Sequence, residues 1–430
     1  MRGLSRRLVA VAAAAASVVA AAPSPAQAHS HGSSKKHVAV AYFTQWGIYG
    51  RDFQLADVQS SGAAKRLTHI NYAFGPVTAD GVCASADPWA DWQTPFSAEN
   101  SVDGVADVAE QPIAGNLNQL AEIKKKNPGL KALISLGGWS GSAYFSDAVL
   151  TDASRKKLVS SCIDLWIKGN LPGLAPGVAA GIIDGIDLDW EWPGSSGNTG
   201  NIIRPEDKQN FTLLLAEFRS QLDKLGRANR KHYELTAFVP AAPAKIDAGF
   251  EVAKVFKYLD FATVQGYDFH GTWEATTNQQ SALRVPAGAP DNPDFSVENT
   301  INAWLAGGAP KKKLVLGVPY YGQGWTGVSG GGDGLFQPAT GPAPSVFGGG
   351  TEDYKTLKNL PAQGYTVHRD LRNGHAWLFD GTTFWTYDDP AVLLQKSLYI
   401  RAKGLGGAMM WSLDGDDSRA SLTKAITAAL

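Results

Sequence analysis

Short apolar runs alternate with longer amphipathic stretches along most of the chain. The apolar runs are rich in β-formers and lack a polar residue at every second position, which is typical of strands buried on both faces. They are Val38–Phe43, His69–Phe74, Leu130–Leu136, Gly181–Trp190, Leu235–Val239, Phe261–Gln265, Lys313–Val318 and Gly406–Trp411. The intervening stretches with helical period are Leu117–Lys126, Ser154–Lys168, Pro205–Leu225, Val297–Leu305 and Pro390–Lys403.

This alternation predicts an α/β protein with a parallel sheet. Eight strand–helix units match a closed (β/α)8 TIM barrel better than an open doubly wound sheet. The open sheet usually has fewer strands and a Gly-rich phosphate-binding turn, and no G-x-G-x-x-G follows the first run here. We therefore expect one barrel over residues 37–430.

One interval is too long for an ordinary barrel loop. A barrel of this type needs about 250 residues, and the chain has 430. Between the seventh strand and the helix that begins at Pro390, residues 323–389 contain two Gly-Gly-Gly runs and then hairpin-like β runs around Asp380-Gly381. A disordered linker is the alternative, but the aromatic β runs favour a small α+β subdomain inserted between strand 7 and helix 7.

The N-terminus has the pattern of an export signal. Arginines precede the Ala/Val run Val9–Ala22, and Ala26-Gln27-Ala28 supplies small residues for cleavage. We expect a signal peptide at residues 1–28 and a flexible leader at 29–36. An uncleaved anchor is the alternative, but the run is short and Ala-rich for a spanning helix. The predicted protein is secreted and extracellular, with no membrane contact in its mature form, and the choice between Sec and twin-arginine export stays open.

Charge and cysteine content narrow the function classes. The chain has 39 Lys and Arg against 40 Asp and Glu, so it lacks the basic surplus of a nucleic-acid-binding protein. Cys83 and Cys162 are its only cysteines, and in an exported protein they can form a disulfide or remain as two buried thiols. Two cysteines without nearby paired histidines do not make a zinc site. We expect no metal and no cofactor.

The segment Asp184–Pro193 carries the most specific chemistry. In a strand with period two, Asp187, Asp189 and Glu191 share one face and the apolar residues between them share the other. The outer face of a barrel strand packs against helices and must be apolar, which turns the carboxylates into the barrel. Glu191 comes last, nearest the carboxyl-terminal mouth where barrel active sites lie.

Three shielded carboxylates, about 6.6 Å apart along the strand, cannot all ionise at low cost. One of them should stay protonated near neutral pH, as a general acid that protonates a glycosidic oxygen must be. Glu191 is our candidate for this acid. A calcium site is an alternative, but it needs a Gly-permitted turn where this segment has bulky strand formers. A merely solvated acidic face, the second alternative, leaves the apolar partner face unexplained.

At these residues the sequence resembles glycoside hydrolase family 18, the chitinases. The family motif D-x-x-D-x-D-x-E is matched by Asp184, Asp187, Asp189 and Glu191. The resemblance continues along the chain in order, at Tyr42–Trp46, Ser135–Trp139, Tyr267-Asp268 and Met409–Trp411.

The resemblance implies a retaining hydrolysis without an enzyme nucleophile, in which the 2-acetamido oxygen of the substrate attacks the anomeric carbon and forms an oxazolinium. Glu191 would protonate the leaving oxygen and then activate water. Asp189 would turn to the acetamide N–H, and Asp187 would share a proton with Asp189. Tyr267 would hold the acetamide carbonyl beneath the anomeric carbon.

The resemblance also implies a set of substrate-binding residues. Trp411 would form the floor of the site and Asp268 would support sugar hydroxyls. Further candidates are Gln265, Tyr321, Trp46, Trp139, Trp273 and Trp325. For each tryptophan, ordinary core packing is the alternative. Gln265 and Gln323 stand where the family often has Met and Arg, which affects substrate preference rather than catalysis. Ser135, Gly137 and Gly138 would support the aspartate row, and His270 would be a positioned loop residue.

The sequence therefore predicts a secreted, monomeric chitinase that cuts β-1,4-linked N-acetylglucosamine in chitin and chitooligosaccharides. An endo-β-N-acetylglucosaminidase acting on glycans is one alternative, and a non-catalytic chitin-binding lectin is another. The inserted subdomain, typical of a deep cleft for several sugars, argues against the first. The presence of Glu191 argues against the second. Exo or endo action is left open.

Overall fold

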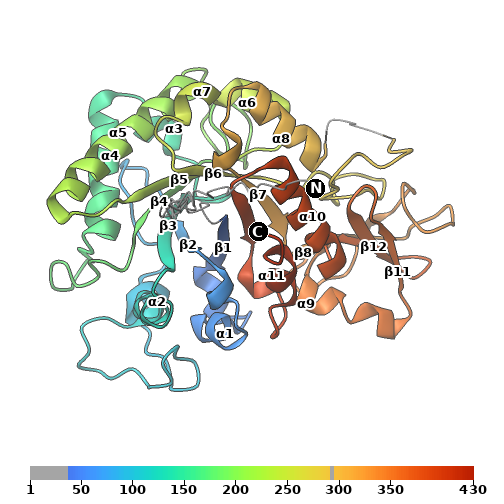
Figure 1. Cartoon of the computed structure of the whole chain (residues 1–430), viewed down its shortest axis with the longest axis horizontal. Helices are drawn as coiled ribbons and strands as arrows, with labels where there is room; N and C mark the ends of the chain where they lie inside the picture. The colour runs from blue at the N-terminus through green and yellow to red at the C-terminus, as the bar shows by residue number, and fades with distance from the viewer. Residues whose placement is uncertain (1–36, 291–294) are drawn as a thin grey trace, which may run out of the picture. The chain divides into compact units, whose positions relative to one another are not determined.

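Eight parallel strands close into a barrel, which confirms the predicted TIM architecture (Figure 1). The computed structural model describes residues 37–290 and 295–430, so the predicted signal peptide and leader lie outside the described residues. Around the barrel the strands follow the order β1-β14-β7-β6-β5-β4-β3-β2. Their bounds are β1 (Val38–Thr44), β2 (His69–Gly75), β3 (Lys131–Gly137), β4 (Gly185–Asp189), β5 (Glu234–Val239), β6 (Phe261–Val264), β7 (Leu314–Pro319) and β14 (Gly407–Trp411).

Each barrel strand overlaps one predicted apolar run, but the fourth is shorter than expected. Strand β4 begins at Gly185 and ends at Asp189, whereas the predicted run covered Gly181–Trp190. The side chain of Asp184 accepts a hydrogen bond from the backbone N–H of Ala132, at the start of the β3–β4 ladder. Glu191 therefore lies two residues beyond the strand, in the loop at the carboxyl end of the barrel.

The two faces of β4 are assigned as the pattern predicted. Ile186, Leu188 and Trp190 are buried in the main hydrophobic core between the strands and the outer helices. The Trp190 ring stacks on Phe145 with their centroids 5.3 Å apart. The apolar outer face leaves the alternating positions, with their carboxylates, inside the barrel.

Helices surround the barrel and connect its strands (Figure 1). They are α1 (Leu55–Ser60), α2 (Gly115–Lys126), α3 (Phe145–Ala148), α4 (Asp152–Cys162), α5 (Asp207–Asn229), α6 (Pro243–Gly249), α7 (Val252–Val255), α8 (Val297–Ala306), α10 (Pro390–Lys403) and α11 (Ser421–Ile426).

Helix α10 shows how local sequence sets helix ends. Asp389 caps its N-terminus by accepting the backbone N–H groups of Ala391 and Val392, and Pro390 occupies the first turn. Gly404 ends it in the left-handed conformation. Helix α4 is shorter than the predicted Ser154–Lys168, because a π-helical turn replaces it over Ile163–Ile167.

The predicted α+β insertion is present as a second, antiparallel sheet beside the barrel (Figure 1). Its strands are β8 (Tyr321–Thr326), β9 (Gly341–Pro342), β10 (Thr351–Asp353), β11 (Thr366–Asp370), β12 (His375–Phe379) and β13 (Phe384–Tyr387), with helix α9 (Tyr354–Leu357) between β10 and β11. Since β8 begins at Tyr321, we propose that the insertion starts there, two residues before the predicted boundary.

Trp325 belongs to the core of this insertion. It is 0% exposed, packs edge-on against Phe384 and donates its indole N–H to the carbonyl of Glu274. Our expectation of Trp325 as a cleft wall is therefore wrong, because a ring at this position stabilises the sheet instead.

Two further features answer questions left by the sequence. Cys83 and Cys162 form a disulfide that joins the β2–α2 loop to α4. Within residues 37–290 and 295–430, no helix combines the length and the apolar character that crossing a membrane requires.

Candidate active site

Asp187 lies at the bottom of the carboxylate row and is completely buried inside the barrel. Three hydroxyl groups from three different strands donate hydrogen bonds to it: Tyr42 at 2.8 Å, Ser135 at 2.9 Å and Thr236 at 2.5 Å. Burial raises the pKa of Asp187, and these hydrogen bonds oppose that rise. The hydroxyl groups thus replace the water that an ionised carboxylate requires.

Asp189 and Glu191 form an interacting pair above Asp187. Burial raises the pKa of Asp189 well above its ordinary value, and the charges of Glu191 and Asp187 raise it further. Burial also raises the pKa of Glu191 to about 8, although the hydrogen bond with Asp189 lowers it. Two interacting carboxyl groups, Asp189 buried and Glu191 half-buried, favour a single shared proton at neutral pH.

The backbone of Glu191 is held on both sides. Its N–H donates to the Ser142 hydroxyl at 3.1 Å, and its carbonyl accepts from the Asn201 side chain at 2.8 Å. Ser142 in turn donates to the carbonyls of Gly138 and Asp189. These contacts position Glu191 in the absence of strand pairing.

Gly137 and Gly138 allow the β3–α3 loop to approach the end of β4. Gly137 has φ +107°, and a Cβ there would lie 2.4 Å from the carbonyl oxygen of Asp189. A Cβ on Gly138 would meet the ring of Phe74 at 2.6 Å. Together with the hydrogen bond from Ser135 to Asp187, these contacts confirm that this motif supports the aspartate row.

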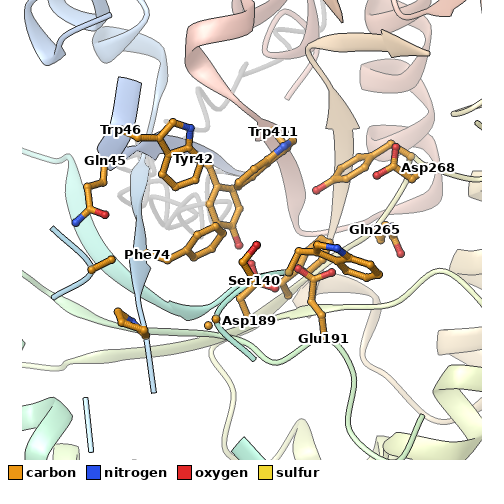
Figure 2. A pocket seen from close by; sticks show the side chains of 17 residues that line it. Tyr42, Gln45, Trp46, Phe74, Ser140, Asp189, Glu191, Gln265, Asp268 and Trp411 are labelled. Carbon is orange, nitrogen blue, oxygen red and sulfur yellow. The ribbon is translucent and has the colours of Figure 1, made fainter. Parts of the chain in front are cut away.

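Asp189 and Glu191 open into a cavity of about 610 Å³ at the carboxyl end of the barrel (Figure 2). This volume falls within the range typical of small-molecule sites. Figure 2 shows Gln45 and Trp46 on one side of the two carboxyl groups and Gln265 and Asp268 on the other. The cavity wall contains eight of the predicted site residues: Trp46, Trp139, Asp189, Glu191, Gln265, Tyr267, Asp268 and Trp411.

The other predicted residues lie elsewhere. Asp187 is beneath the cavity, and Tyr321 is behind Asp268 and donates its hydroxyl to it at 2.6 Å. Trp273 is 62% exposed and is absent from the cavity wall. His270, which we predicted to be a positioned loop residue, forms a hydrogen bond of 2.9 Å with Glu274.

Asp268 is oriented by the inserted sheet. Besides Tyr321, the Gln323 amide donates to it at 3.3 Å, and both residues belong to β8. Burial raises the pKa of Asp268, whereas these two hydrogen bonds lower it. The insertion therefore contributes to the site indirectly, by directing one carboxyl group of the barrel.

Aromatic side chains form much of the remaining wall. The rings of Phe74 and Trp411 stack with their centroids 5.7 Å apart, and Tyr42 meets Trp411 edge-on at 5.1 Å. Trp46 lies 6.1 Å from Phe74. Such apolar faces suit the apolar faces of sugar rings. Phe74, Phe238 and Gln45 are wall residues that we did not predict, although two of them lie at the mouth of strands β2 and β5.

The described part of the chain contains no group of three or more His, Cys, Asp or Glu side chains that could hold a metal ion.

A closed eight-stranded barrel with a coupled pair of carboxyl groups beneath an aromatic cavity has the form of a barrel glycosidase. Residues 38–416 match the glycosyl hydrolases family 18, and the chain belongs to this family.

Several similar proteins are chitinases. Chitinase A1 of Niallia circulans is 36% identical and Chitinase C of Streptomyces lividans is 37% identical, each over 88% of this chain. The chain spans only 56% and 57% of the length of these two relatives. The solved catalytic domain of a psychrophilic chitinase B from Arthrobacter TAD20 is 47% identical with a TM-score of 0.88, and the match covers 91% of this chain and 95% of that domain.

Proposed function

We propose that the chain is a chitinase that hydrolyses β-1,4-linked N-acetylglucosamine in chitin and chitooligosaccharides with retention of configuration. The observation that carries the proposal is the pair of buried Asp189 and half-buried Glu191, in which desolvation raises both pKa values so that one proton is kept at neutral pH. The position of this pair beneath an aromatic wall and the chitinase relatives support the sugar class.

In the first step Glu191 acts as the general acid. As the bond between the anomeric carbon and the glycosidic oxygen breaks, its carboxyl proton moves to that oxygen and the shortened chain leaves as an alcohol. The carbonyl oxygen of the substrate's own 2-acetamido group attacks the same carbon, which gives an oxazolinium ion. No enzyme nucleophile takes part.

In the second step the ionised Glu191 acts as the general base. It removes a proton from a water molecule, whose oxygen attacks the anomeric carbon and opens the oxazolinium. Two inversions at this carbon return the β-configuration. Glu191 regains its proton, and the product is the β-anomer.

The neighbouring groups would orient and stabilise the acetamide. Asp189 would turn from Glu191 to accept the acetamide N–H and to stabilise the positive charge, sharing a proton with Asp187 below it. Tyr267 would donate to the acetamide carbonyl and hold it under the anomeric carbon. Trp411 would support the sugar ring, and Asp268 and Gln265 would bind its polar groups.

We also propose that the protein is secreted and acts as a monomer. The pattern of residues 1–28 and the disulfide support export to an oxidising compartment. Recovery of the chain from culture medium with His29 as its first residue would test the signal peptide, and light scattering would test the monomer.

Product analysis tests the activity. The parent protein should release short β-anomeric oligomers from colloidal chitin and from a chitin hexamer. Glu191→Gln should reduce the rate at least ~10²-fold, while hexamer binding measured by calorimetry persists.

Other outcomes would select the alternatives. Binding without cleavage by the parent protein would favour a chitin-binding lectin. Release of glycans from glycoproteins, with chitin left intact, would favour an endo-β-N-acetylglucosaminidase. Initial α-anomeric products would contradict the substrate-assisted mechanism.

A further inference from the structure

Asp91 is a buried carboxylate that lies outside the catalytic row. It belongs to the π-helical turn Trp89–Gln93 in the β2–α2 loop and is 0% exposed. Its Oδ1 accepts from the Gln45 amide at 2.5 Å and from the Tyr72 hydroxyl, and its Oδ2 accepts from the Ser85 hydroxyl at 2.5 Å. Asp91 does not line the cavity, so it cannot touch a substrate there.

The donors to Asp91 come from separate parts of the fold. Gln45 directly follows β1, Tyr72 lies on β2, and Ser85 lies on the β2–α2 loop itself. Asn116, in the first turn of α2, donates to the Gln45 carbonyl at 3.2 Å and to the Tyr72 hydroxyl at 3.1 Å. The network therefore holds both the side chain and the backbone of Gln45.

Two parts of the cavity wall meet at this carboxylate. Gln45 and Trp46 form one part, on the side opposite Gln265 and Asp268 (Figure 2). Ala86, next to Ser85 in the chain, forms the other part. One Asp91 oxygen accepts from Gln45 in the first part, and the other accepts from Ser85, the chain neighbour of Ala86 in the second.

We propose that Asp91 is a positioning residue that sets the wall formed by Gln45, Trp46 and Ala86, and that it thereby determines affinity for chitin chains long enough to reach this wall. The inference rests on the proposed function. A shift of this wall would weaken binding of the sugar that lies on it, while Asp189 and Glu191 would keep their own supports from Ser142 and Asn201.

The pH dependence of the hexamer KM provides a second readout for Asp91. Burial raises the pKa of Asp91 to about 6, and the nearby charge of Asp87 contributes to the rise. The charged or titratable groups that face it are Tyr72 and Tyr49, whose pKa values are both raised, and Asp87, which accepts from the Tyr49 hydroxyl at 2.6 Å. A raised acid pKa favours the ordered state at low pH, and the Tyr72 and Ser85 hydroxyls can accept the O–H of a protonated Asp91. Protonation below pH 6 should therefore leave the wall in place.

The test compares Asp91→Asn with the parent protein on chitin oligomers of two to six sugars. We expect KM for the hexamer to rise about tenfold, KM for the shortest cleaved oligomer to change less than about twofold, and kcat to stay within about twofold. The hexamer KM of the parent protein should not rise as the pH falls through 6. A KM that is unchanged at every length, or a kcat loss of the same size at every length, would overturn the proposal.

Asp416→Asn is a matched control. Asp416 is a buried carboxylate that accepts hydrogen bonds from the Leu422 and Thr423 backbone and from the Thr423 hydroxyl, away from the cavity. The Asp416→Asn variant should have a lower melting temperature than the parent protein. Its KM should not differ from the parental KM in a way that depends on oligomer length. If Asp91→Asn fails to fold, Ser85→Ala removes one donor and should raise hexamer KM in the same direction by a smaller factor.

The inference can fail separately from the proposed function. Cleavage by the parent protein tests the function, and the ratio between variant and parent tests Asp91. If the parent protein binds chitin hexamer without cutting it, calorimetric Kd values for the trimer and hexamer replace KM. A hexamer-specific loss of affinity would then still support the role of Asp91, and equal losses would contradict it.

Discussion

The proton shared by Asp189 and Glu191 controls how the site responds to pH. The pKa of Glu191 is raised to about 8, mainly by burial, and the nearby positive charge of Lys245 lowers it. A general acid acts only while protonated, so kcat/KM should persist below pH 8 and fall about tenfold per pH unit above it. Removing the charge with Lys245→Gln should shift this limb to higher pH. A pH profile of kcat/KM for both proteins checks this. An alkaline fall in kcat/KM at the same pH in both proteins would contradict the electrostatic role of Lys245.

Hydrogen bonds from three hydroxyl groups replace water around Asp187, so the loss of one of them should be measurable. Thr236→Val keeps the shape of the side chain but removes the 2.5 Å hydrogen bond to Asp187. We expect a stability loss of about 1–3 kcal/mol, measured by urea denaturation. Thr263→Val, on the neighbouring strand β6, removes only a 3.4 Å contact to the Ala237 carbonyl from an equally buried threonine. Equal losses of stability in the two variants would show that the hydrogen bond from Thr236 to Asp187 contributes no more than the weak contact of Thr263.

Part of the residue-scale site follows from sequence spacing alone. The period of two places Asp187 and Asp189 inside the barrel, because the outward side chains between them are apolar. The partners of Asp187 do not follow from spacing, since Tyr42, Ser135 and Thr236 lie 145, 52 and 49 residues away along the chain. Only the register of the closed barrel brings them together.

At the scale of elements, the junction between β3 and β4 determines where the acid lies. Gly137→Ala would place a Cβ 2.4 Å from the Asp189 carbonyl oxygen, at a φ of +107° that L side chains rarely adopt. We expect a stability loss of more than about 1 kcal/mol and a fall in kcat, because the end of β4 must move. Denaturation and steady-state kinetics measure these effects.

Gly129→Ala is the control for this junction. A Cβ there meets nothing within 4 Å, and the residue precedes the same strand. It should leave kcat unchanged. A Gly137→Ala variant with parental kcat would show that the close approach of the β3–α3 loop is unnecessary for catalysis.

The elements themselves were easier to predict than their ends. Long apolar runs identified the barrel strands, because burial on both faces leaves little room for polar residues. The end of β4 at Asp189 and the π-helical turn Ile163–Ile167 depend on tertiary contacts that local pattern does not contain. Trp325 shows the same limit: an aromatic residue near a strand end looks alike whether it faces a cleft or the core of a second sheet.

At the scale of the whole molecule, Arg51 connects the barrel to the inserted sheet. It lies between β1 and α1, and its guanidinium is 2.7 Å from Asp353 on β10 and 2.8 Å from Asp414 after β14. The two carboxylates are only 5% and 1% exposed. Removing the cation leaves Asp414 without this partner and Asp353 with only the more distant Lys355, at 3.6 Å.

Arg51→Met should therefore cost about 3 kcal/mol at pH 7, near the lower end for broken buried pairs because Arg51 is 20% exposed. Burial raises the pKa of Asp353 and Arg51 lowers it, so the variant should raise that pKa further. A raised acid pKa favours the folded state at low pH, and this advantage is lost as the pH rises. The stability gap between parent and variant should thus widen from pH 4 to pH 7 in urea denaturation.

The exposed pair of Arg284 and Glu298, 3.3 Å apart, provides the matched comparison. Arg284→Met should cost at most about 1 kcal/mol, with little pH dependence over the same range. Adding Asp353→Asn to Arg51→Met should recover part of the loss, because it removes one buried charge that Lys355 compensates only in part. Hydrogen exchange should locate the effect in β8 and β10, since these strands depend on Arg51 for their connection to the barrel. A uniform loss across all barrel strands would mean that Arg51 stabilises the fold generally and does not couple the insertion to it.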